Sequence, residues 1–151
     1  MKLISSDFEN GGEIPVEFTC QGRGISPGLA WSEVSGRAKS LALSLIDPDA
    51  PGGNFIHWQI INITVDTTGI GQGETIGQEL QNSAGGVGYY PPCPPMPTGG
   101  QASGRHRYIF TLYALDSEEI YQPKEVNFAS QVNPHIIEKA ELLGYYQKSN
   151  V

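Results

Sequence analysis

The sequence predicts a mainly β protein, formed by antiparallel sheets with long ordered loops, in a single domain spanning residues 1–151. Several segments alternate apolar and polar residues with a period of two, which is typical of strands. The chain also contains 19 glycines and 11 prolines, and only 17% of its residues are charged. This composition favours strands joined by turns over a helical bundle.

Three strand candidates are clear, and others are weaker. Residues 40–47 alternate and end in an acid, residues 55–63 are nearly all apolar, and residues 106–115 begin with a histidine and continue apolar. Weaker candidates are residues 13–19 and 28–33, with a short strand near 2–5.

One helix is expected near the C-terminus. Asn133 is suited to an N-cap, Pro134 to the first helical position and Gly144 to the C-cap. Apolar residues follow at helical spacing at positions 136, 137, 140 and 143. These signals predict a helix over residues 133–144.

Acidic and histidine side chains adjoin the three clear strands. Prolines at 48 and 51 bracket Asp49 directly after Asp47, which makes the turn rigid and able to position carboxylates. His57 lies within the second strand, and His106 begins the third with Tyr108 on the same face. If these segments converge, they form a small pocket for an anion or a metal.

Structural roles compete with this interpretation. A histidine in an apolar strand is more often a core residue than a ligand. Asp47 could cap its turn through an Asx interaction. Asp49 could form a structural ion pair with Arg107 or Arg105.

Charge and the N-terminal sequence suggest a cytoplasmic protein that binds neither nucleic acid nor membrane. The net charge is -7, without basic clusters, and the N-terminus has no apolar signal-like region. No apolar run is long enough to span a bilayer. Cys20 and Cys93 could form one disulfide, but a cytoplasmic location argues against it. We expect Cys93 to be a buried small residue.

Several motifs resemble the phosphatidylethanolamine-binding protein family, which includes the Raf kinase inhibitor protein. They are Asp47–Pro51, His57-Trp58, Tyr90–Pro95, His106–Phe110, the Ser26–Trp31 element and the C-terminal stretch from Asn133 to Gly144. The short chain resembles the bacterial and archaeal branch. The resemblance covers nearly the whole chain in order.

The resemblance implies a larger central sheet packed on a smaller one and an anion-binding pocket. Its implied ligand positions are Asp47, Pro51, His57, Pro95, His106 and Tyr108. It also favours an ordered lid within residues 66–105, whose subsegment 96–103 we expect to be mobile. We expect no metal and no cofactor. A small anionic or phosphorylated ligand, a kinase or peptidase partner, and a homodimer are the implied partners.

Three functions remain open. The first is a regulatory module that binds a phosphorylated ligand, in which imidazoles and the Tyr108 hydroxyl donate to an oxyanion. Asp47 would orient an imidazole or accept from a ligand amine. The second is a peptidase inhibitor, for which no reactive-site signature is visible. The third is a histidine-dependent or metal-assisted hydrolase, which lacks an evident nucleophile. The Gly24–Gly28 match to G-x-S-x-G is not a nucleophile elbow, because Pro27 has no N–H for an oxyanion hole.

Overall fold

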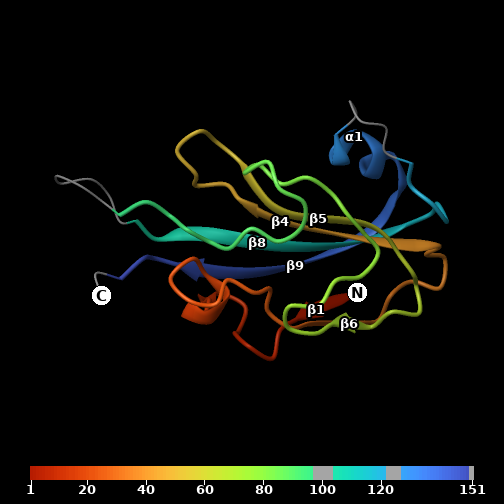
Figure 1. Ribbon diagram of the computed structural model, residues 1–151. Helices are drawn as coiled ribbons and strands as arrows, with labels where there is room; N and C mark the ends of the chain where they lie inside the picture. The colour runs from red at the N-terminus through yellow and green to blue at the C-terminus, as the bar shows by residue number, and fades with distance from the viewer. Residues whose placement is uncertain (97–103, 122–126, 150–151) are drawn as a thin grey trace.

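The computed structural model describes residues 1–96, 104–121 and 127–149 (Figure 1). The segment expected to be mobile, residues 96–103, falls outside this description apart from Met96. The preceding residues up to 96 pass over the ends of the large-sheet strands (Figure 1).

The described residues form two sheets. The larger sheet has six strands in the order β2-β9-β8-β4-β5-β7, and the smaller has three in the order β1-β3-β6. The strands are β1 (Lys2–Ile4), β2 (Gly12–Glu13), β3 (Leu29–Ser32), β4 (Ser40–Asp47), β5 (Phe55–Ile63), β6 (Gly69–Ile70), β7 (Gln78–Glu79), β8 (His106–Leu115) and β9 (Ile136–Tyr146). Short helical segments are η1 (Val16–Phe18), α1 (Phe128–Val132) and η2 (Asn133–His135).

The main core lies between the two sheets. Alternate residues of β4, β5 and β8 face it, and they are buried together with Leu3 of β1 and Trp31 of β3. A second cluster covers the other face of the large sheet, where Phe128 and Val132 of α1 pack on Ile61. The small sheet and α1 therefore lie on opposite sides of the large sheet (Figure 1).

The predicted fold class is confirmed. The structure is mainly β, with a larger and a smaller sheet and one short helix in the C-terminal part of the chain. Strands β4, β5 and β8 have the predicted bounds. The sheets are not purely antiparallel, because β2 pairs with β9 in parallel.

The predicted strand over residues 13–19 is wrong beyond its first residue. Gly12 and Glu13 form β2, and the turn of η1 begins at Val16. Pro15 immediately before it has φ -58 and no N–H, so it cannot donate to a continuing ladder.

The predicted helix over residues 133–144 is also wrong. The helix α1 lies earlier, Pro134 belongs to the short η2, and residues 136–146 form the long strand β9. Strand β9 pairs with β8 from Leu115↔Ile136 to His106↔Tyr146. Gly144 is not a helix cap. Its lack of a side chain lets Ile14 and Phe8 pack against it, since a Cβ there would meet Ile14 Cγ1 at 2.5 Å.

Cys20 and Cys93 form a disulfide, which the expected cytoplasmic location argued against, and Cys93 is half-buried where a buried residue was expected. Disulfides persist mainly in oxidising compartments. In the part of the chain that the structure describes, no helix is long and apolar enough to cross a membrane.

Candidate functional site

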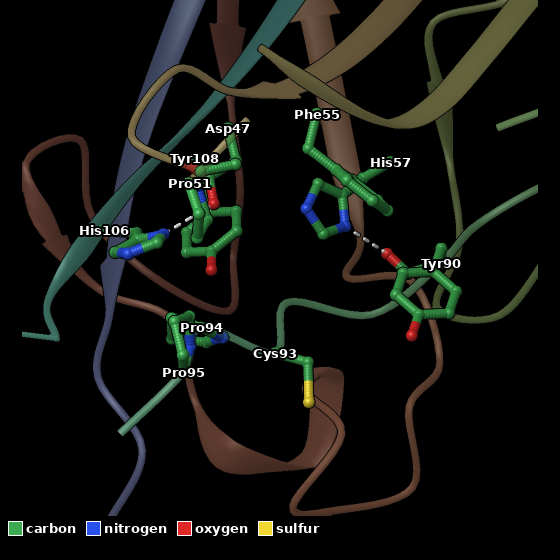
Figure 2. A pocket seen from close by; sticks show the side chains of 11 residues that line it. Asp47, Pro51, Phe55, His57, Tyr90, Cys93, Pro94, Pro95, His106 and Tyr108 are labelled. Atoms are coloured by element: carbon green, nitrogen blue, oxygen red, sulfur yellow. Dashed lines mark hydrogen bonds and ion pairs between the residues drawn. The ribbon is translucent and has the colours of Figure 1, made fainter. Parts of the chain in front are cut away.

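The ends of three strands converge on one pocket. Its lining includes all six ligand positions expected from the sequence, Asp47, Pro51, His57, Pro95, His106 and Tyr108. The cavity measures about 200 Å³, which suits a small head group better than a drug-sized molecule. Figure 2 shows these side chains facing one another around the opening. The structure therefore brings the two histidine-bearing strands together at one pocket.

Asp47 fixes His106 at the inner wall. The Nδ1 atom of His106 donates to Oδ2 of Asp47 at 2.7 Å, and the backbone N–H of Asp49 donates to Oδ1 at 2.7 Å. Asp47 is 3% exposed and His106 is 8% exposed. The carboxylate therefore orients the imidazole and also caps its turn through an Asx interaction, so two of the roles considered from the sequence occur together.

His57 is fixed from the opposite side by the backbone of Tyr90. Its Nδ1 lies 2.7 Å from the carbonyl oxygen of Tyr90, and the Tyr90 N–H donates to the His57 carbonyl at 2.8 Å. A carbonyl oxygen only accepts, so Nδ1 carries the proton. Burial lowers the pKa of His57, partly opposed by the Tyr90 carbonyl and the Asp47 charge. The expectation that His57 donates to an oxyanion near neutrality is therefore not supported by this geometry.

Tyr108 lies between the two imidazoles. Its ring centroid is 5.4 Å from that of His57, in an edge arrangement, and 6.5 Å from that of His106, in a stacked one. The hydroxyl is buried and forms no hydrogen bond of normal geometry among the described residues, although the Asp47 carboxylate lies close enough to act on it. Burial raises the pKa of Tyr108, and the Asp47 carboxylate raises it further, so the hydroxyl keeps its proton. A buried unpaired hydroxyl is costly, which makes it a strong candidate to contact a ligand.

A proline-rich segment forms the outer wall. Pro94 and Pro95 line the pocket, and Cys93 between them and Pro92 carries the disulfide to Cys20. The N–H of Cys20 also donates to the Pro92 carbonyl at 3.1 Å. Prolines have no N–H to donate, so the disulfide and this hydrogen bond position the wall.

Asp49 and Arg107 support the turn and do not line the pocket. Arg107 Nη2 lies 2.8 Å from Asp49 Oδ1, and the Arg107 N–H donates to Oδ2. The Arg107 guanidinium lowers the pKa of Asp49 to about 2. The alternative partner, Arg105, pairs with Glu13 at 2.6 Å and stacks on Tyr145.

Sequence reasoning missed part of the lining. Phe55 and Tyr90 pack against His57, with ring centroids 4.7 Å and 5.9 Å from the imidazole. Phe55 could have been found, because it lies two residues before His57 and so shares its face. Tyr90 could not have been placed, because its position depends on where the loop crosses β5.

The fold and the pocket define a two-sheet protein with a histidine- and proline-lined site. A family model, described as phosphatidylethanolamine-binding protein, matches residues 4–147. This span covers most of the chain, so the chain belongs to the phosphatidylethanolamine-binding protein family.

Relatives and solved structures agree with this assignment. The chain is 41% identical to a UPF0098 protein of Chlamydia pneumoniae, over 99% of this chain and 100% of that one. It is 39% identical to a UPF0098 protein of Methanothermobacter thermautotrophicus, over 98% and 99%.

Two crystal structures have the same fold. One is described as a putative phosphatidylethanolamine-binding protein homologue from Chlamydia trachomatis. It has a TM-score of 0.86 and 38% identity over 98% of this chain and 97% of that one. The other is YbcL of E. coli, described as a member of the mammalian family, with a TM-score of 0.86 and 27% identity over 98% of both chains.

Proposed function

We propose that this protein is a binding module for a small phosphorylated ligand, and that the pocket between β4, β5 and β8 holds the phosphate group. The observation that carries the proposal is the buried, unpartnered hydroxyl of Tyr108 between two imidazoles. This hydroxyl donates to a phosphate oxygen. His106 contributes a second donor when its imidazole is charged, with Asp47 as its counter-charge.

The rim favours a ligand with an apolar or aromatic part attached to its phosphate. Tyr90 lines the pocket and is 39% exposed, and Phe55 packs on both His57 and Tyr90. Polar groups lie deep and apolar groups lie outside, which is the usual arrangement in small-molecule sites. A phosphate monoester would therefore enter with its phosphate first.

Regulation of a protein partner by this binding event, a homodimer and a cytoplasmic location remain predictions from the sequence and its resemblance. The Cys20–Cys93 disulfide counts against the cytoplasmic location. No feature of the described residues specifically favours peptidase inhibition over ligand binding.

A pair of tyrosine variants tests the proposal. Tyr108→Phe removes only an unpaired hydroxyl, so stability should be retained while binding of phenyl phosphate weakens several-fold, by the roughly 0.5–1.5 kcal/mol of one hydrogen bond. Tyr89→Phe is the matched control, because the Tyr89 hydroxyl donates to the Phe18 carbonyl at 2.7 Å. It should lower stability by about 1 kcal/mol and leave binding unchanged.

Isothermal titration calorimetry with phenyl phosphate and phosphoethanolamine measures the binding, and urea denaturation measures the stability. Equal affinity of Tyr108→Phe and the wild type would contradict the proposed site. The same titrations with added zinc or manganese examine the hydrolase alternative. Metal-dependent turnover of either ester would favour that alternative over a binding module.

A further inference from the structure

We infer that the pocket selects an oxyanion that still carries an acidic proton, so that a phosphate monoester binds as its monoanion and a sulfate ester of the same shape binds poorly. This inference rests on the proposed function and names the class of ligand within it. It depends on the hydrogen-bonding capacity of His57.

The inward-facing nitrogen of His57 is an acceptor. A neutral imidazole has one N–H, and the Tyr90 carbonyl holds it on Nδ1. Figure 2 shows Nδ1 on the Tyr90 side of the ring, and the other nitrogen, Nε2, on the side of Asp47 and Tyr108. Burial lowers the pKa of His57, so this neutral form is kept at neutral pH. A ligand atom that meets Nε2 must therefore donate a hydrogen.

The charges around His57 favour the same ligand. The groups that face it are Asp47 on β4, His106 and Tyr108 on β8, and Tyr90 on the loop. Among the described residues that line the pocket there is a buried carboxylate and no lysine or arginine. Arg107, close by in sequence to His106, is paired with Asp49. Asp47 therefore repels a dianion more strongly than a monoanion, and the His106 imidazole that could offset this charge is itself paired with Asp47.

A phosphate monoester monoanion satisfies each of these groups. Its P–O–H donates to Nε2 of His57, and another oxygen accepts from the Tyr108 hydroxyl. The second pKa of such an ester is near 6, so about half of it is the monoanion at about pH 6 and only a small fraction is at about pH 8. A sulfate monoester is also tetrahedral and singly charged, but it has no proton to offer to His57.

The test compares phenyl phosphate with phenyl sulfate by calorimetry at about pH 6 and about pH 8. At about pH 6 the phosphate should bind at least about tenfold more tightly, the loss expected when an acceptor is left unpaired. The preference should shrink at about pH 8, where the phosphate has lost its proton. Equal affinities at about pH 6 would overturn the inference while leaving the proposed function intact. Binding of neither compound would overturn the proposed function and the inference with it.

His57→Phe isolates the acceptor, because a phenyl ring can pack with Phe55 and Tyr90 as the imidazole does. The variant should bind the two esters with similar affinity at about pH 6. His135→Phe is the matched control, since His135 lies in η2 and pairs with Asp116 far from the pocket. It should keep the full preference. A His57→Phe protein with an unchanged preference would contradict the role of His57, and the wild-type comparison decides the case if this variant does not fold.

Discussion

The Nδ1–H of His106 points at the carboxylate of Asp47 across 2.7 Å, and this contact joins the first residue of β8 to the last residue of β4. Because the carboxylate accepts, the proton lies on Nδ1 and the other ring nitrogen is left for solvent or a ligand. The pairing fixes the tautomer of His106 in the same way that Tyr90 fixes that of His57.

Replacing Asp47 with asparagine should weaken phosphate binding, because His106 loses the carboxylate that fixes its Nδ1–H and its orientation. We expect at least about a tenfold loss, the scale of one charge-assisted hydrogen bond. Calorimetry with phenyl phosphate measures this. An affinity equal to that of the wild type would show that Asp47 does not act through His106.

The Asp49–Arg107 pair should contribute modestly to stability and only above acid pH. The side chains are 31% and 48% exposed, so Asp49→Asn should cost at most about 1 kcal/mol at pH 7. The pKa of Asp49 is lowered from 3.8 to about 2. Its contribution is therefore complete above about pH 4 to 5 and is lost as the pH falls towards 2.

Urea denaturation of wild type and Asp49→Asn at pH 7 and pH 2 checks this sign. Glu17→Gln is a useful control, because Glu17 and Arg23 are 3.9 Å apart and exposed. A wild-type advantage at pH 2 as large as at pH 7 would be inconsistent with the lowered Asp49 pKa.

Reduction of the Cys20–Cys93 disulfide should lower stability and loosen the pocket wall. A bridge between residues 73 apart typically contributes about 2–4 kcal/mol. The proline-rich wall would lose the disulfide and keep the Cys20–Pro92 hydrogen bond, so phenyl phosphate should also bind less tightly.

Denaturation and calorimetry with and without a dithiol reductant measure both effects. The double variant Cys20→Ser/Cys93→Ser should have the stability and affinity of the reduced protein. Adding the reductant should change neither quantity. Two free thiols found by alkylation and mass spectrometry in protein purified without reductant would rule the bridge out.

Gly144→Ala should be strongly destabilising, by about 1–3 kcal/mol, because the added methyl would overlap Ile14 and Phe8. Gly36→Ala should be nearly neutral, since nothing lies within 4 Å of a Cβ there. Thermal denaturation compares the two. A mild effect at Gly144 would mean that β9 can move away from β2 without cost.

The strands that build the pocket could be predicted because their signals are strong and local. Strands β4, β5 and β8 each show a long apolar pattern, and each carries a polar residue where it meets the pocket. The pocket residues followed from these strands together with the rigid Asp47–Pro51 turn.

Strand β9 could not be predicted in this way. Residues 136, 137, 140 and 143 have helical spacing, and Asn133 and Pro134 are good helix-start residues. The long pairing with β8 outweighs these local preferences. The disulfide was missed for a different reason, since the compartment was inferred from the sequence and the distance between Cys20 and Cys93 depends on the fold.

The central claim is that His57 and His106 meet a phosphate group in one pocket, and nitrogen NMR of the imidazole rings tests it most directly. Before ligand is added, His57 should show a protonated Nδ1 and an unprotonated Nε2 at pH 7. Adding phenyl phosphate should shift the Nε2 resonances of both histidines and leave those of His135 unchanged. Binding without any change at His57 and His106, or a His57 protonated on Nε2 alone, would contradict the account.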